Sequence, residues 1–533
     1  MQDKMRDSND TKILKKSRGI GFAMLASRIL GVIRDAVIAM LFGAGFYSDA
    51  FFLTFRIPDF MRKSFSDGVL SISFVPVFTE YITEKGRTEA FAMARSAFFL
   101  TAFVSGLIVA AGIVSAPAVL KMTGAGTGVE SCEFDLIVRL MRIMMPYLFC
   151  IFLMAVCMGI MNGLGSFTPS ALAPVILNLV IIFSGFALSP FFDPPVLALA
   201  VGVLAGGILQ LAWQMFFAGA SGFVFWRSLK LFYPGNLVHP GAVKAAKMFF
   251  PAVIGASSYQ INLLVVTMMA ATLLSGSVSY LYYADRLVQF PLALFTVSVS
   301  IVLLPELAKT IASEKEKAAC DLFKTGGMLV LFITIPSMAG LLVLREPVVS
   351  LLFCRGAFGA AAVKETSETL VYLIFGLWAF AGTRLFVTLF YAFSNVKIPF
   401  RAGVAAVAVN LVLSFCLINV MGHKGLAMAV SFAAMANFFF LFASALPRLK
   451  KEIVQTLFWS GFRALVFSGI MYAAVNLMFF SVLEQGGPDN GGLFAKVVIC
   501  VFLGVFVYLG CALVVQTPEI KILKNLIHRK KEN

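Results

Sequence analysis

The stretch SRILGVIRDAVIAMLFGAGFYSDAFFLTFRIPDFMRKSFSDGVLSISFVP (residues 27–76) decides the fold, because it places charges inside two long apolar helices. An ionised side chain at the centre of a bilayer costs roughly 2.5–3.5 kcal/mol. Several of them in one hairpin cost about 10 kcal/mol unless they face water, each other or a charged ligand. Arginine is in excess here, and its planar guanidinium suits phosphate, so the stretch predicts a cavity for an anionic ligand. The charged residues of the two helices are Arg28, Arg34, Asp35, Asp49, Arg56, Asp59, Arg62 and Lys63.

The composition of the whole chain is that of a polytopic membrane protein. Hydrophobic residues make up 60% of its 533 residues, whereas a soluble globular chain has about 45–50%. The net charge of +16 is attributed to cytoplasmic loops rather than to nucleic-acid binding. The eight cysteines lie mostly in apolar runs without a CxxC pair, which argues against a zinc site or a disulfide framework. The polar start leads into a helix without a small-residue cleavage site, so no cleaved signal peptide is expected.

Hydropathy over a window of ~20 residues predicts a series of transmembrane helices. Fourteen candidate spans result, at residues 17–43, 48–80, 89–118, 134–161, 168–190, 195–220, 244–274, 279–308, 321–343, 365–393, 398–420, 424–446, 456–481 and 492–516. Lys and Arg then fall on one side of the membrane, for example before the first span, between the sixth and seventh spans and in the tail. The opposite loops, such as SPFFDPP and EQGGPDNGG, carry almost none. By the positive-inside rule both termini are predicted to be cytoplasmic.

The chain also contains an internal repeat with an offset of about 230 residues. Residues 45–60 resemble residues 276–291, residues 161–182 resemble residues 394–414, and LALAVGVLAGG resembles GLAMAVSFAAM. Six spans per repeat leave both copies in the same orientation, with a ligand site expected at the interface between them. The predicted fold is therefore an all-α polytopic membrane protein with fourteen transmembrane helices, arranged as two pseudo-symmetric six-helix lobes plus two C-terminal helices. The expected divisions are 1–220, 221–450 and 451–533.

Helical spacing indicates which charges share a face. Asp49, Arg56, Asp59 and Lys63 form a stripe on the second span, where Pro58 is expected to bend the helix and residues 66–68 to break it. Asp285 and Arg286 lie on the eighth span, its repeat partner, and Arg384 lies deep in the tenth.

A structural reading of these residues stays open. The charges can simply pair with one another, as Asp35 with Arg34 or Asp285 with Arg286. Asn178 and Asn410 are expected to bond helix to helix. Residues 345–359 are predicted to form a short interfacial helix outside the membrane.

Enzyme chemistry has little support in the sequence. GxxxxGK[ST], HExxH and GxSxG are absent, and the three histidines fall in predicted loops or in the tail. The predicted outer loops are also short, whereas a membrane glycan enzyme usually carries a large one. We therefore expect a transporter without a cofactor or a metal site.

Three stretches resemble the MurJ (MviN) family of lipid II flippases, within the multidrug/oligosaccharidyl-lipid/polysaccharide exporter superfamily. They are SRILGVIRDAVIAMLFGAG (27–45) followed by SDAFF, IPDFMRKSFSDGVLSISFVPVF (57–78) and YYADRLVQFPLALFTVSVSIVLLP (282–305). The resemblance covers essentially the whole chain. It implies transfer of lipid II, the undecaprenyl-diphosphate-linked peptidoglycan precursor, from the inner to the outer leaflet of the bacterial cytoplasmic membrane. Membrane lipids and cell-wall synthesis proteins are the other implied partners.

The resemblance also implies roles for particular residues. The substrate-binding residues would be Arg28, Arg34, Asp49, Arg62 and Arg286, with secondary candidates Asp35, Arg56, Asp285 and Arg384. The polyprenyl tail would lie along the last two spans. Two departures stand out, because some members have an acidic residue near Gln289 and some use an aspartate in the seventh span for sodium. The seventh span here has no aspartate, so no sodium site of that kind is expected.

Three alternatives remain open from the sequence. The chain could instead flip another polyprenyl-diphosphate glycan, export drugs by cation coupling, or be a membrane glycan enzyme. Arginine-dependent binding of a diphosphate lipid separates the flippases from the drug exporter, and turnover of the glycan itself would identify the enzyme.

Overall fold

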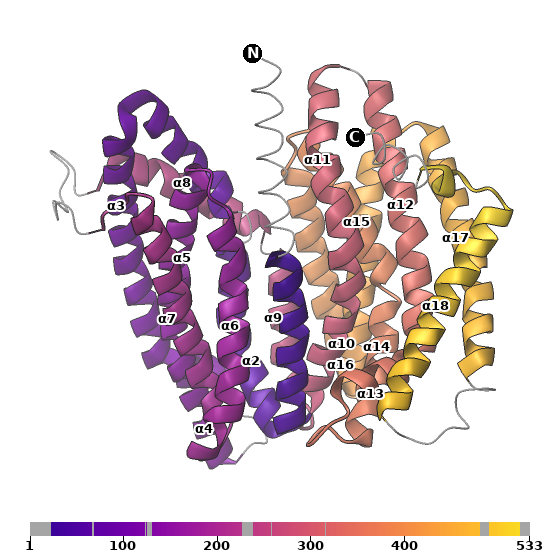
Figure 1. Ribbon diagram of the computed structural model, residues 1–533, viewed down its shortest axis with the longest axis horizontal. Helices are drawn as coiled ribbons and strands as arrows, with labels where there is room; N and C mark the ends of the chain where they lie inside the picture. Colours follow the sequence, from indigo (N-terminus) through magenta and orange to yellow (C-terminus); the bar gives the residue numbers. More distant parts are fainter. Residues whose placement is uncertain are drawn as a thin grey trace. The chain divides into compact units, whose positions relative to one another are not determined.

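Every regular element of the described chain is a helix (Figure 1), which confirms the predicted all-α class. The computed structural model describes residues 23–66, 69–122, 124, 130–225, 238–256, 258–314, 316–479 and 490–522. By internal packing the chain divides into two compact units, Met1–Ser279 and Tyr280–Asn533.

The first unit begins with helical residues 23–42. The helices that follow are α2 (Phe46–Ser66), α3 (Val69–Met122), α4 (Ser131–Met144), α5 (Pro146–Gly163), α6 (Thr168–Ala187), the 3-10 turn η1 (Ser189–Phe191), α7 (Leu197–Ala220), α8 (Pro240–Ala256) and α9 (Ser258–Ala270). Helix α3 packs against α5 and α8, α6 packs against α7, and α2 packs against α4, α5 and α9. The core under α3, α5 and α8 is rich in aromatic and aliphatic side chains, among them Phe78, Met93 and Ile160.

The second unit contains the rest of the helices. They are α10 (Ser277–Pro291, whose first three residues belong to the first unit), the π-helical turn η2 (Leu292–Thr296), α11 (Val297–Ala312), α12 (Glu316–Val343), α13 (Arg345–Phe353), α14 (Ala360–Ile374), α15 (Leu377–Ala392), α16 (Lys397–Ala445), the 3-10 turn η3 (Leu446–Arg448), α17 (Lys451–Met478) and α18 (Asn490–Val514). Helix α12 packs against α17, α15 against α16, and α17 against α18. Residues 518–522 form a last helical turn.

Glycines interrupt the two longest helices. Gly86 in α3 has φ 83° and ψ 168°, and Gly422 in α16 has φ 57° and ψ −134°. Both conformations strongly favour a residue without a Cβ. Each glycine falls between two spans that the sequence separates, the second from the third and the eleventh from the twelfth. The chain thus reverses or bends at these points without a loop.

The break predicted at residues 66–68 stays a prediction. Helix α2 ends at Ser66 and α3 begins at Val69, while Asp67 and Gly68 lie outside the described residues. Pro58 lies inside α2, which continues past it. The tenth predicted span is likewise two helices, α14 and α15, which meet at an angle of 44°.

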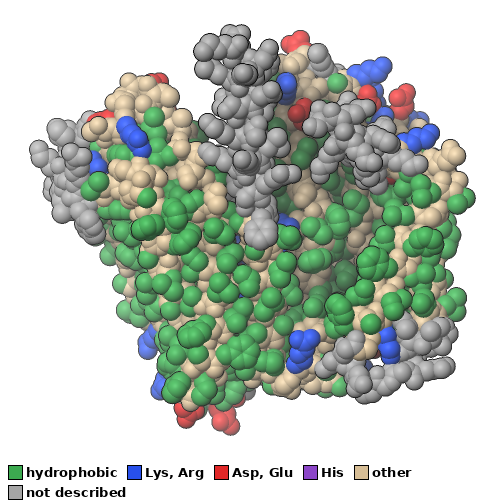
Figure 2. Space-filling model, in the orientation of Figure 1, with side chains coloured by type: hydrophobic (Ala, Val, Ile, Leu, Met, Phe, Trp, Pro, Cys, Tyr) green, Lys and Arg blue, Asp and Glu red, His purple; other side chains and the backbone are tan. Residues whose placement is uncertain are grey.

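Nine helices of the described chain are long and apolar enough to cross a membrane, or ten when the α14–α15 pair is taken as one span. This count is below the predicted fourteen, because α3 and α16 each cover two predicted spans or parts of them. Helix α2 and residues 23–42 are also too charged to qualify by composition. On the visible face of each unit, hydrophobic side chains cover the middle of the helices, and charged ones gather at their ends (Figure 2). The chain therefore has the surface of a multi-pass membrane protein.

Two further predictions concern the boundary between the lobes and a short helix within 345–359. The compact units divide after Ser279, because α8 packs on α3 and α9 on α2, whereas the lobe boundary predicted from the repeat lies after residue 220. The repeat boundary describes sequence similarity rather than packing, and it stays a prediction. The expected short helix within 345–359 is present as α13, with Val349 and Phe353 buried against its neighbours.

Candidate functional site

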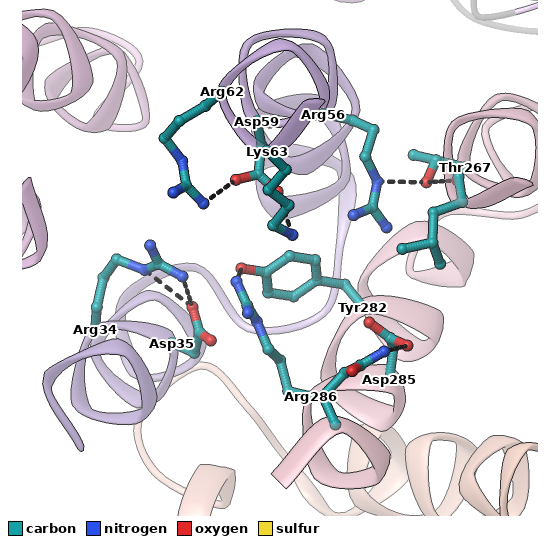
Figure 3. Close-up of polar contacts among 12 residues, drawn as sticks. Arg34, Asp35, Arg56, Asp59, Arg62, Lys63, Thr267, Tyr282, Asp285 and Arg286 are labelled. Carbon is teal, nitrogen blue, oxygen red and sulfur yellow. Dashed lines mark hydrogen bonds and ion pairs between the residues drawn. The ribbon is translucent and has the colours of Figure 1, made fainter. Parts of the chain in front are cut away.

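Arg34 is held between its neighbour Asp35 (Figure 3) and a second helix of the first unit. Its Nε and Nη2 atoms donate to Oδ1 of Asp35 at 3.0 and 2.6 Å, and Nη1 donates to Oδ1 of Asn178 on α6 at 3.1 Å. Arg34 is 6% exposed and Asp35 2%. A buried charge is tolerable only when it is paired and hydrogen-bonded, and this arrangement meets that condition.

The carboxylate of Asp59 on α2 binds two cations one turn further along the same helix (Figure 3). Its Oδ1 accepts a hydrogen bond from Nη2 of Arg62 at 2.8 Å, and its Oδ2 lies 2.7 Å from Nζ of Lys63. The spacings i,i+3 and i,i+4 place these side chains on one helical face. Asp59 is 7% exposed at its side chain, while each cation is 21% exposed, so the cations keep an open side.

Arg56 joins α2 to α9. Its Nε donates to the hydroxyl of Thr267 at 2.9 Å, and that hydroxyl donates in turn to the carbonyl of Leu263 at 2.7 Å. The sequence places Arg56 in the charged stripe of the second span, as a secondary candidate for the site. The contact with Thr267 is a helix-to-helix bond.

Asp49, at the start of α2, accepts hydrogen bonds from the start of α10. Its Oδ2 accepts from the backbone N–H of Gly276 at 2.6 Å. Its Oδ1 accepts from the N–H and the hydroxyl of Ser279 at 2.8 and 2.5 Å. The first N–H groups of a helix lack partners within the helix, and a carboxylate there also favours the helix dipole. Asp49 therefore caps α10, a role that the sequence did not predict.

In the second unit, Arg286 and Asp285 contact residues of their own helix, α10. Nη2 of Arg286 donates to the hydroxyl of Tyr282 at 2.7 Å, and the guanidinium lies 4.9 Å from the centre of that ring (Figure 3). Oδ1 of Asp285 accepts from the amide of Gln289 at 3.4 Å. Both residues are half-buried. A guanidinium on an aromatic face keeps its charge available to an anion.

The other two candidate arginines are more open. Arg28 is half-buried on the helix of residues 23–42, and Arg384 is exposed on α15. The structure thus joins Arg34 to Asp35 and Arg62 to Asp59 within the first unit. Sequence reasoning missed the partners Thr267, Tyr282 and Ser279. Only Tyr282 left a signal, since it stands four residues before Arg286 and shares its helical face.

Asn178 has the contact that the sequence predicted for it, a bond between helices. The structure gives Asn410 a partner in its own helix, because Ser414 donates to its Oδ1 at 3.4 Å. Within the described residues, no group of three or more His, Cys, Asp or Glu side chains is placed to hold a metal ion.

Comparison with known proteins gives a consistent result. The family model described as "Lipid II flippase MurJ" matches residues 38–490. The "Probable lipid II flippase MurJ" of Vibrio cholerae serotype O1 is 34% identical and covers 81% of this chain and 82% of its own. The "Lipid II flippase MurJ" of Burkholderia cenocepacia is 31% identical, with 86% and 89% covered.

Solved structures agree with the sequence relatives. The structure "Lipid II flippase MurJ, inward closed conformation" matches with a TM-score of 0.77 at 26% identity, over 95% of this chain and 99% of that chain. An inward-facing MATE-family multidrug transporter of the MOP superfamily shares the fold, with a TM-score of 0.66 at 13% identity over 79% and 95%. The chain therefore belongs to the lipid II flippase MurJ family.

Proposed function

We propose that this chain is a lipid II flippase, a transporter rather than an enzyme. Its substrate would be undecaprenyl-diphosphate-linked disaccharide-pentapeptide, moved from the inner to the outer leaflet of the bacterial inner membrane. Family membership supports this reading. The observation that carries it is a set of guanidinium groups set among apolar helices, with Arg34 almost fully buried. Such groups are costly in a membrane unless they face water, each other or a charged ligand, and the basic side chains outnumber the acidic ones in residues 27–76.

Four arginines are proposed to bind the diphosphate: Arg28, Arg34, Arg62 and Arg286. Each provides charge-assisted hydrogen bonds with a planar geometry that suits phosphate. The carboxylate of Asp59 would hold Arg62 in the absence of substrate, and a phosphate oxygen would take its place. Such an exchange keeps the guanidinium paired throughout, so its desolvation is never left uncompensated.

The remaining candidates fit supporting roles. Asp49 would hold the start of α10 through its contacts with Gly276 and Ser279. Arg56 would fix α2 to α9. Asp35 would orient Arg34. Asp285 and Arg384 stay secondary candidates for the cavity.

Transport would follow alternating access between two six-helix lobes, with divisions at 1–220 and 221–450 and two extra helices in 451–533. Support for fourteen crossings comes from the glycine breaks, which divide α3 and α16 where the sequence separates two spans. The distribution of Lys and Arg supports cytoplasmic termini. The exposed apolar side chains of α17 and α18, such as Trp459 and Phe506, would adjoin the polyprenyl tail. Cell-wall synthesis proteins stay predicted partners.

The test is replacement of the lipid II flippase of a bacterium. A strain depleted of its own flippase would express this chain, and growth and lipid II in the outer leaflet would be measured. Wild type should restore both, whereas Arg34→Ala and Arg286→Ala should restore neither at equal expression. Arg139→Ala, which removes an exposed arginine on α4, is the matched control and should behave as wild type.

Each other outcome has a definite meaning. A well-expressed wild-type chain that restores no outer-leaflet lipid II would overturn the proposed substrate. Binding of another polyprenyl-diphosphate glycan would then identify it as a flippase of different specificity. Rescue by both arginine variants would overturn the arginine site while leaving the family assignment intact.

A further inference from the structure

Asn178 stands in the middle of α6, an otherwise apolar helix of the first unit. Asn178 is only 6% exposed. A buried amide is costly unless both its donor and its acceptor find partners. Here both partners lie on the helix of residues 23–42: Oδ1 accepts from Nη1 of Arg34 at 3.1 Å, and Nδ2 donates to the carbonyl of Ser27 at 3.2 Å.

The two bonds connect positions two turns apart on that helix. Side chains on a helix lean toward its N-terminus, so the guanidinium of Arg34 reaches back toward Ser27. Gly31 lies between them, and a Cβ added there would be 3.9 Å from Nδ2 of Asn178. The amide therefore lies against the bare face of Gly31. It fixes both the rotation of the helix and the direction of the guanidinium.

The chemistry of this contact matters as much as its geometry. Asp35 already provides one negative charge to Arg34 through two hydrogen bonds, so the pair has no net charge. A second carboxylate in contact would make the group negative and repel a diphosphate. An amide supplies the third acceptor without a charge. Asn and Asp are nearly the same size, so the site distinguishes them by charge and by the donor to Ser27.

We propose that Asn178 is a positioning residue of the diphosphate site. It holds the guanidinium of Arg34 in one orientation and adds no negative charge to the Arg34–Asp35 pair. This inference rests on the proposed function, because it assumes that Arg34 binds the diphosphate. The competing explanation is that Asn178 only joins two helices and contributes to stability alone.

A double-mutant cycle separates the two explanations. The purified full-length chain in nanodiscs would be titrated with undecaprenyl diphosphate, and Kd would be measured for wild type, Asn178→Leu, Arg34→Ala and the double variant. If Asn178 acts through Arg34, Asn178→Leu weakens binding roughly tenfold. The same substitution then changes nothing in the Arg34→Ala background. A contribution to stability alone would leave Kd unchanged by Asn178→Leu, and an effect independent of Arg34 would change Kd equally in both backgrounds; either result would overturn the inference.

Two further variants guard the result. Asn178→Asp keeps an acceptor for Arg34 but adds a negative charge. It should retain the fold and weaken diphosphate binding more than Asn178→Leu does. Tighter or unchanged binding would contradict the charge argument. If Asn178→Leu proves unstable, the cycle is run with Asn178→Ala, which also removes the amide without adding a charge. Asn410→Leu removes a buried amide in the second unit and should leave Kd unchanged.

The same data distinguish failure of this inference from failure of the proposed function. If Arg34→Ala binds undecaprenyl diphosphate as wild type does, the arginine site itself is wrong, and the inference falls with it. If Arg34→Ala weakens binding and Asn178→Leu does not, only the role of Asn178 is wrong.

Discussion

Each acidic side chain of the charged helices has a definite partner at the scale of single residues. Asp35 and Asp59 contact arginines, whereas Asp49 contacts backbone N–H groups. The sequence left open that Asp35 pairs with Arg34, since the two are adjacent. It gave no sign of the Asp49 contacts, which join residues 227 and 230 positions apart. Local charge pairs are visible in a sequence, but contacts across a fold depend on packing that the pattern does not encode.

Removal of the Asp59 charge is expected to weaken the fold and to increase the response to diphosphate. In Asp59→Asn, Arg62 and Lys63 lose their shared carboxylate, which should lower the free energy of unfolding by about 2–3 kcal/mol. An anion that binds the folded state restores stability by mass action. Thermal unfolding should therefore show a lower Tm for the variant and a larger rise with inorganic pyrophosphate than for wild type.

The matched control for that variant is Asp321→Asn. Asp321 pairs with Lys324 at 2.9 Å with the same i,i+3 spacing, but its side chain is 58% exposed. Exposed pairs contribute little, so its Tm should equal that of wild type. An equal drop in Tm for both variants would show that the buried Asp59 pairs stabilise the fold no more than an exposed pair does.

Glu519, beyond the last apolar helix, should make stability depend on pH. Glu519 is 1% exposed. Its Oε1 accepts hydrogen bonds from the hydroxyl of Ser460 at 2.6 Å and from Nη2 of Arg463 at 3.1 Å. Burial raises the pKa of this carboxyl, but the hydrogen bonds and the positive charge of Arg463 outweigh burial, so its pKa lies below the usual value. A lowered pKa stabilises the fold at pH above about 4.3. That stabilisation is lost as pH falls through the native pKa.

The Glu519→Gln variant tests this dependence. At pH 7.5 its Tm should be lower than that of wild type, and the gap should stay constant down to about pH 4.3 and close as the pH falls further. Glu314→Gln changes an exposed glutamate and should show no such gap. A Tm difference that persists unchanged well below about pH 4.3 would mean that the carboxylate charge is not the stabilising feature.

At the scale of elements, the predicted spans correspond to helices, but hydropathy does not show how they are joined. The eleventh and twelfth spans form one named helix, α16, in which Gly422 alone departs from helical geometry. The eighth is α10 and α11 joined by a π-helical turn after Pro291. Hydropathy averages over about 20 residues, so it detects an apolar segment and overlooks a one-residue break. Glycine and proline mark possible breaks, yet Pro58 lies inside a continuous α2.

Gly422→Ala is expected to destabilise the second unit. The conformation with φ 57° and ψ −134° strains any residue with a Cβ, at a cost of about 1–3 kcal/mol. Space is not the cause, since an added Cβ would have no atom within 4 Å. Gly469→Ala in α17 is the control, because it also meets open space but has no such backbone. It should be neutral or raise Tm, since alanine favours a helix. Similar Tm values for both variants would refute the strain argument.

The break between α14 and α15 depends on a hydroxyl from α16. Ser431 donates to the carbonyl of Tyr372 at 2.6 Å, which is the kind of backbone group left without a partner at a bend. A Cβ on Gly376 would lie only 2.9 Å from Cα of Ser431, so the two backbones approach closely there. Ser431→Ala should lower the free energy of unfolding by about 1–2 kcal/mol.

Ser444→Ala serves as the control for that prediction. Ser444 donates to the carbonyl of Phe440 within its own helix, and this hydrogen bond is exposed. A hydroxyl of this kind competes with the helix rather than supporting it, so its loss should leave Tm unchanged or raise it. A Ser431→Ala variant as stable as Ser444→Ala would show that the bend needs no donor from α16. Tm would be measured for both in the same detergent.

At the scale of the whole molecule, composition predicts the fold class, whereas the division into compact units depends on packing. The apolar fraction and the distribution of charge suffice to predict an all-α membrane protein. A long apolar segment in lipid must satisfy its backbone hydrogen bonds within itself, and a helix is the regular structure that does so. The two compact units are a different matter. Helices α8 and α9 pack within the first unit, although the repeat assigns residues 240–270 to the second copy. Repeats report ancestry along the chain, whereas packing depends on which side chains meet.

Orientation in the membrane is the property of the whole chain that a thiol probe can test. Cys132, at the start of α4, is exposed and is predicted to lie outside. Ser313, after α11, is exposed and is predicted to lie in the cytoplasm. In a chain without other cysteines, Cys132 should react in intact cells with a thiol reagent that does not cross membranes. A cysteine in place of Ser313 should react only after permeabilisation. In the fourteen-span arrangement, spans four to eight separate the two sites, so five crossings lie between them. Labelling of both cysteines in intact cells would contradict this odd number of crossings. The reverse labelling pattern would show that the predicted orientation is inverted.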